Sequence, residues 1–209
     1  MKKGIFYMLL AALLFSSMEI ALKLTGSTYH PLQLNALRFF IGGLILLPLA
    51  HRQNRNLPLR LPAWEYGFYA MTGLVCVVVS MTIYLLSIRY TEASTVAVIF
   101  SCNAFFAVIF SAIFLRQPVS KMTACGLFVA FSGLALLMDP LHMGGDAAGI
   151  ILAVASAVLF AAYAVMVKYG QGKSRYHGLL PTAYTFIFGT LELFALMALT
   201  HTAPMAALL

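Results

Sequence analysis

Seven apolar stretches, each about as long as a helix that crosses a bilayer, fill most of this 209-residue chain. An α-helix rises about 1.5 Å per residue, so roughly 20 residues cross the hydrocarbon core of a membrane. A helix also pairs its backbone donors and acceptors within itself, as lipid requires. We therefore expect an all-α integral membrane protein with seven transmembrane helices. The expected helices cover residues 5–24, 32–50, 66–88, 93–114, 121–138, 148–167 and 179–200.

The composition also favours a lipid environment. Hydrophobic residues make up 62% of the chain, charged residues only 9%, and the mean hydropathy is +0.94. Such a chain lacks the polar surface that a soluble protein of this length needs. The first stretch follows Lys2 and Lys3, as a signal peptide would, but it contains Glu19 and Lys23 and precedes no small-residue cleavage pattern. We expect this stretch to be retained.

The net charge of +7 is unevenly distributed between the loops. Ten of the 13 Lys and Arg residues fall on one side of the expected helices, and such an excess marks the cytoplasmic side. We therefore expect a multi-pass protein of the cell (inner) membrane, with the N-terminus in the cytoplasm and the C-terminus outside. No nucleic-acid partner is expected. The ten residues are Lys2, Lys3, Arg52, Arg55, Arg60, Arg116, Lys121, Lys168, Lys173 and Arg175.

A sequence pattern near the beginning of the chain is repeated near residue 155. Residues 10–15 are followed eight positions later by Lys23, and the similar residues 155–160 are followed eight positions later by Lys168. Because five expected helices precede the second copy, it enters the membrane from the opposite side, as in an inverted repeat. We expect a five-helix unit at 1–138 and part of a second unit at 148–209. Chance similarity between two Ala- and Leu-rich helices is the alternative.

Residues along most of the chain follow one family pattern. They include Phe15, Ser16, Ser17, Lys23, Pro31, Arg38 and Phe39, then Tyr84, Ala93, Phe105, Phe106, Gly126 and Gly133, and finally Gly149, Phe160, Tyr163 and Lys168. Together they resemble EamA-type units of the drug/metabolite transporter superfamily. The resemblance implies two five-helix units that export amino acids or similar small polar metabolites through a central cavity by alternating access. It implies no ATP-binding domain.

The chain departs from the family pattern in local detail and in length. Asn103 stands where the family often has a proline, and Gln117 stands where it often has a glutamate. A complete second unit would need about three more helices than the seven expected here. Either the sequence is a truncated product, or a second chain completes the helix bundle.

Charged residues within membrane spans cost roughly 2.5–3.5 kcal/mol each, so they are the first candidates for a substrate site. Glu19 would bind a substrate ammonium group or a coupling proton; Lys23, four residues later, pairs with it or reaches the interface. Arg38 would hold a substrate carboxylate, anchor the helix at the interface or pair with Glu19. Glu192 has no basic residue within a turn, and it is either a cavity carboxylate or a protonated group bonded to a neighbouring helix.

Three neutral polar residues complete the expected substrate-binding set. Tyr84, Asn103 and Tyr163 lie at membrane depth, and interhelical hydrogen bonding is the alternative role for each. A stripe of small residues on the sixth expected helix predicts close approach of another helix. Its members are Gly149, Ala153, Ala157 and Ala161.

No enzyme site, metal or cofactor is expected. Cys76, Cys102 and Cys125 lie in separate expected helices, where we interpret them as buried apolar residues, and no pair of histidines has zinc-ligand spacing. Three hypotheses for function remain. The first is a secondary transporter of a small polar metabolite, the second a seven-helix receptor or scaffold, and the third an inactive remnant or partner-requiring part of a ten-helix transporter.

Overall fold

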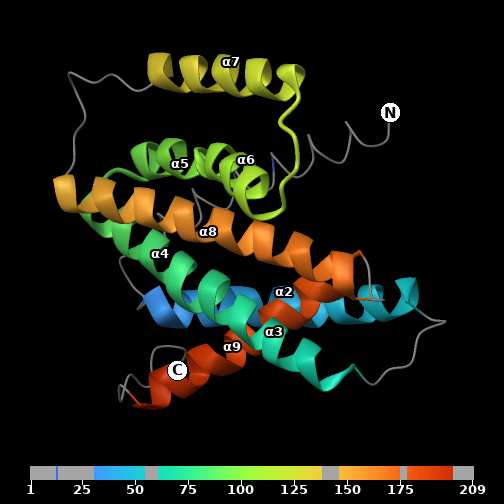
Figure 1. Cartoon of the computed structure of the whole chain (residues 1–209). Helices are drawn as coiled ribbons and strands as arrows, with labels where there is room; N and C mark the ends of the chain where they lie inside the picture. The colour runs from blue at the N-terminus through green and yellow to red at the C-terminus, as the bar shows by residue number, and fades with distance from the viewer. Residues whose placement is uncertain (1–12, 14–30, 55–60, 138–145, 175–177, 200–209) are drawn as a thin grey trace.

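The computed structural model describes residues 13, 31–54, 61–137, 146–174 and 178–199. These residues form helices joined by turns, and no strand occurs in this part of the chain (Figure 1). The helices are α2 (Pro31–Gln53), α3 (Ala63–Gly73), η1 (Leu74–Ser80), α4 (Met81–Tyr90), α5 (Ala93–Ser101), α6 (Asn103–Phe114), α7 (Lys121–Leu137), α8 (Ala147–Lys173) and α9 (Leu180–Leu199).

Five helical spans are long and apolar enough to cross a membrane. They are Leu32–Gln53, Ala63–Tyr90, Ala93–Phe114, Ala147–Lys173 and Leu180–Leu199. Each overlaps one of the expected stretches. The stretch at 5–24 lies outside the described residues, and α7, at 17 residues, is shorter than the other spans. For the described residues the all-helical membrane fold is therefore confirmed, whereas the count of seven helices stays a prediction.

Helix α8 crosses the bundle diagonally and packs against α4, α5, α6 and η1 (Figure 1). The stripe of small residues on α8 is buried, as expected, and the side chains of Ala153, Ala157 and Ala161 are wholly inaccessible. At one end of the stripe, a Cβ added to Gly149 would collide with Thr91. The absence of side-chain bulk thus lets the neighbouring helices approach the backbone of α8.

Helices α2 and α9 pack along one another. Their contact includes an edge-to-face pair of Phe39 and Phe186, with ring centroids 4.8 Å apart, and a second pair of Phe40 and Phe194 at 6.3 Å. Helix α9 also packs on α3 and η1. There Gly73 and Gly189 bring the two backbones together, because a Cβ on Gly73 would lie 2.6 Å from the amide nitrogen of Gly189.

Two helices are less regular than the sequence suggests. The span Ala63–Tyr90 is continuous but contains a π-helical segment, η1, between α3 and α4. The stretch at 93–114 is interrupted at Cys102, where α5 ends and α6 begins. Asn103 therefore begins a helix and does not lie in the middle of one. Its amide Nδ2 donates to the Phe100 carbonyl at 2.7 Å, which accounts for a local turn at this position.

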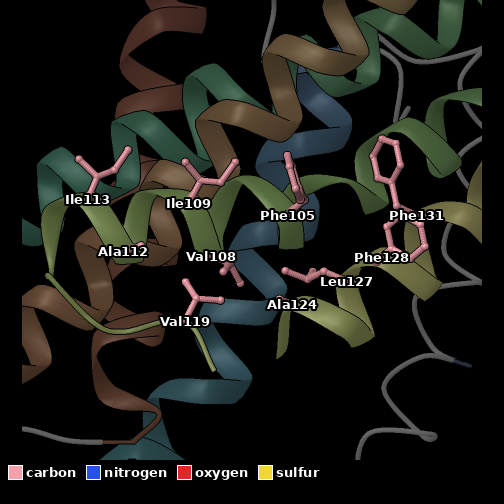
Figure 2. A pocket seen from close by; sticks show the side chains of 10 residues that line it. All are labelled: Phe105, Val108, Ile109, Ala112, Ile113, Val119, Ala124, Leu127, Phe128 and Phe131. Carbon is pink, nitrogen blue, oxygen red and sulfur yellow. The ribbon is translucent and has the colours of Figure 1, made fainter. Parts of the chain in front are cut away.

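Helix α7 lies at the edge of the bundle, above α5 and α6 in Figure 1. Its described side chains are exposed apart from Leu127, which is half-buried. The space between α6 and α7 is a groove of about 480 Å³. Its lining residues, drawn in Figure 2, are all apolar, and they include Ile109, Leu127 and Phe131. The expectation that Cys125 is buried is wrong, because this face of α7 is uncovered.

Candidate functional site

Arg38 lies on α2, two turns from the start of that helix. Its Nη2 donates to the Asn35 Oδ1 at 3.0 Å, and its Cζ lies 4.6 Å from the centroid of the Phe39 ring. Asn35 and Arg38 are three residues apart and therefore share a face of the helix. The charged group is thus fixed by its own helix before any contact with a ligand.

Asn35 connects Arg38 to the π-helical segment. The Asn35 side chain is fully buried, and its Nδ2 donates to the Val77 carbonyl at 2.9 Å and to the Thr82 Oγ1 at 3.2 Å. Val77 belongs to η1, where the wider turn alters the backbone hydrogen bonding of a standard α-helix. A single amide therefore positions the guanidinium and also satisfies a backbone acceptor of η1.

Asn35 was missed as a candidate from the sequence, although a detectable signal existed. An asparagine three residues before an intramembrane arginine can accept a hydrogen bond from it on the same helix face. That spacing would have pointed to Asn35. Its second contact, with Val77, joins residues 42 positions apart, and no local pattern indicates it.

Tyr84 and Tyr163 lie at the two ends of a row of aromatic rings. The Tyr84 ring is 4.7 Å from Phe100, Phe100 is 5.2 Å from Phe160, and Phe160 is 5.5 Å from Tyr163. Both tyrosines are buried, with 2% and 8% of their surfaces exposed. The row joins α4, α5 and α8, so these two candidates are structurally linked.

Cys76 is buried beside some of these residues. Its side chain is 1% exposed, as expected for a buried cysteine, and it belongs to the same buried cluster as Phe39, Val77 and Tyr163. Arg38 meets this cluster at the Phe39 ring, and Tyr84 meets it through Phe100 and Phe160. The structure thus brings Arg38, Tyr84 and Tyr163 together with Asn35 and Cys76. We call these five residues the Arg38 group.

Two of the other expected site residues that the structure describes, Asn103 and Glu192, are not hydrogen-bonded to the Arg38 group. In the described part of the chain, the Asn103 amide bonds the Phe100 carbonyl of the preceding turn, and Glu192 hydrogen-bonds to none of the group. The Glu192 Oε2 is buried and has no hydrogen-bond partner among the described residues, in keeping with the lack of a nearby base in the sequence. Glu19 and Lys23 lie outside the described residues.

A second buried polar contact lies at the other end of the bundle. Glu65, in the first turn of α3, is 1% exposed, and its Oε1 accepts a hydrogen bond of 2.6 Å from the Ser174 Oγ. Its Oε2 is buried without a partner in the described structure. This contact joins the beginning of α3 to the end of α8. The sequence did not single out Glu65, because it lies at the edge of an apolar stretch and not within it.

No group of three or more potential metal ligands occurs in the part of the chain that the structure describes. The groups available for chemistry in the Arg38 group are a guanidinium, a carboxamide, a thiol and two phenols. A guanidinium with forked donors suits a carboxylate, and phenols and amides hydrogen-bond to polar groups. The arrangement therefore favours binding of a small polar or anionic molecule.

The fold and these polar groups define a multi-pass helical membrane protein. Comparison with known proteins gives the family: the EamA-like transporter family matches residues 2–139, and the chain belongs to it.

The relatives are transporters whose substrates are not named. An uncharacterized transporter of Clostridium kluyveri is 31% identical over 208 residues, which cover 96% of this chain and 66% of the relative. An uncharacterized transporter of Haemophilus influenzae is 23% identical, over 79% of this chain and 55% of the relative. This chain thus spans between half and two thirds of the length of these two relatives.

A solved crystal structure of a protein gives the same fold. It superposes with a TM-score of 0.62 at 21% identity, over 91% of this chain and 68% of that one. The likeness supports the helical arrangement described above. It carries no information about substrate.

Proposed function

We propose that this chain works in a secondary transporter that exports amino acids or similar small polar metabolites by alternating access. The observation that carries the proposal is the hydrogen-bonded arrangement of Arg38, Asn35 and the Val77 carbonyl. An arginine at membrane depth is costly, and such residues usually mark substrate or ion pathways. Here its orientation is fixed in advance by a buried amide, which lowers the cost of ordering the site when a carboxylate binds.

The packing of α2 and α9 supports the inverted repeat. If residues 148–209 begin a second unit, α8 corresponds to the first expected helix and α9 corresponds to α2. In a pair of units related by a twofold axis, a helix that lies beside the axis contacts the equivalent helix of the other unit. Helices α2 and α9 pack along one another in this way. The two units would then rock about a site near the midplane. Arg38 would bind the substrate in that site, with Tyr84 and Tyr163 beside it.

Glu19, Lys23, Asn103 and Glu192 keep their proposed roles in the same pathway. Glu192 is the most informative of the four, because a half-buried carboxylate with an unpartnered oxygen is a candidate for carrying a coupling proton. We place the N-terminus in the cytoplasm and the C-terminus outside, in the inner membrane, on the distribution of Lys and Arg. The alternative is that transport requires a second chain, since the relatives are longer.

A comparison of cellular metabolites tests this function before the substrate is identified. Cells would express the parent chain, Arg38→Gln, or the control Arg52→Gln, which removes the same charge from an exposed position at the end of α2. We expect the same small polar metabolites to be depleted by the parent and by Arg52→Gln, and to be retained with Arg38→Gln. Equal depletion by Arg38→Gln would remove Arg38 from the transport pathway.

A further inference from the structure

Helices α3, α6 and α8 enclose a second apolar groove, of about 700 Å³, on the outer face of the bundle. Its volume falls within the ~300–1,000 Å³ typical of sites for small ligands. Several of its side chains are open to the bilayer: Met71 is 59% exposed, Phe114 71% and Tyr169 50%. The groove is therefore accessible to a lipid chain from the side.

One end of this groove is basic. Lys173 lies one turn beyond Tyr169 on α8, and its Nζ lies 4.5 Å from the centroid of the Tyr169 ring. Arg116 directly follows Leu115, which lines the groove. The loop that carries Arg116 is fastened to α8, because the Lys168 Nζ donates to the Gln117 Oε1 at 2.5 Å.

These three cations are exposed, and none of them forms an ion pair with an acidic side chain of the described structure. The acidic residue beside them is Glu65 of α3, which accepts a hydrogen bond from Ser174, directly after Lys173, and is only 1% exposed. The exposed charge at this end of the groove is therefore positive in the described structure. By the distribution of Lys and Arg, this end lies at the cytoplasmic surface, where anionic lipids gather.

We propose that the groove between α3, α6 and α8 binds an anionic phospholipid, with an acyl chain along Met71, Phe110 and Met166 and the phosphate near Lys173 and Arg116. The apolar lining matches the chain, and the cations at one end match the headgroup. A zwitterionic headgroup is disfavoured, because its ammonium would lie beside Lys168, Lys173 and Arg116. This inference concerns the lipid-facing surface and stands independently of the transported substrate.

The single tryptophan of the chain offers a direct probe of this site. Trp64 is 47% exposed, and its ring lies 6.0 Å from that of Phe68, which lines the groove. The full chain would be placed in vesicles of one fixed mixture of phosphatidylcholine and phosphatidylglycerol. In one set the phosphatidylglycerol would carry brominated chains, and in the other the phosphatidylcholine would. Bromine quenches tryptophan emission at short range, so the set with the stronger quenching identifies the lipid that occupies the groove. The surface charge of the vesicles is the same in both sets.

Quenching per brominated lipid is expected to be greater for phosphatidylglycerol, and neutralising one cation should lower that preference by about fivefold. The variant Lys173→Gln tests the headgroup contact, and Ala162→Phe, which fills the groove, tests the chain contact. Arg52→Gln is the control, because it removes the same charge from the end of α2, outside the groove. Equal quenching by the two lipids in the parent chain would overturn the proposal. So would an equal loss of preference in Arg52→Gln and Lys173→Gln.

Discussion

At the scale of single residues, Arg38 depends on Asn35. The Asn35 oxygen accepts a hydrogen bond from the Arg38 guanidinium, and the Asn35 nitrogen donates to η1 and α4. Both polar atoms of the Asn35 carboxamide are therefore hydrogen-bonded. A fully buried amide that bonds in both directions leaves several groups unsatisfied when it is removed. Asn35 therefore has a structural role and also positions Arg38.

The variant Asn35→Ala should lower the free energy of unfolding by about 1–3 kcal/mol, because the Val77 carbonyl and the Arg38 guanidinium each lose a buried partner. Thermal unfolding of the purified chain in detergent would measure the effect. Asn54→Ala is the matched control, since the Asn54 amide bonds the Ala50 carbonyl at the end of the same helix and is only half-buried. A smaller loss for Asn35→Ala than for Asn54→Ala would contradict the description of this network.

At the scale of helices, close packing depends on small side chains. The buried stripe on α8 lets several helices reach its backbone, and the close approach of Gly73 and Gly189 does the same for α3 and α9. In a membrane no hydrophobic effect drives helices together, so van der Waals packing between closely approaching helices contributes much of their association. Added bulk on the buried side of α8 should therefore be poorly tolerated.

The substitution Ala157→Leu should destabilise the chain by about 1–3 kcal/mol, because the side chain of Ala157 is wholly buried and the neighbouring helices would have to move. The control Val154→Leu also enlarges a side chain of α8, but at a position that is 40% exposed. Melting temperatures measured in detergent should be lower for Ala157→Leu than for Val154→Leu. Similar melting temperatures for both variants would show that the α8 interface is not tightly packed.

The sequence predicts the helices better than it predicts their irregularities. Five expected stretches overlap membrane-length spans, because hydropathy alone determines which segments lie in lipid. The break at Cys102 was missed, since it depends on where the Asn103 amide finds an acceptor and leaves the mean hydropathy unchanged. The π-helical segment was missed because residues 74–80 are as apolar as their neighbours.

The candidate site was predicted in part for a similar reason. Arg38, Tyr84 and Tyr163 stand out because polar groups at membrane depth are few, and the structure links them through one buried cluster and the aromatic rings packed on it. Asn35 and Glu65 were missed because their significance comes from partners that are 42 and 109 positions away. A single sequence identifies unusual residues, but it does not identify which of them meet.

At the scale of the whole molecule, the five membrane-length spans and the family match agree on a transporter scaffold. This chain spans between half and two thirds of the length of the two relatives, and seven crossings are expected from its sequence. An odd number of crossings places the two termini on opposite sides of the membrane. The distribution of Lys and Arg predicts that the C-terminus is the one outside.

Reporter fusions at the C-terminus test this arrangement. A phosphatase that is active only outside the cytoplasm should be active, and a fluorescent protein that matures only inside should stay dark. The same two reporters inserted within residues 55–60, which include Arg55 and Arg60, should give the opposite result. Fluorescence from the C-terminal fusion would show that the number of crossings or the orientation is wrong.

The central claim is that Arg38, positioned by Asn35, binds the transported molecule. The most direct measurement is the rate at which the purified chain moves a metabolite identified in the cellular comparison across the membrane of proteoliposomes. Loss of a charged hydrogen bond of about 1.5–3 kcal/mol predicts a rate at least about tenfold lower for Arg38→Gln, with Arg52→Gln close to the parent. Equal rates for Arg38→Gln and the parent chain would contradict the account.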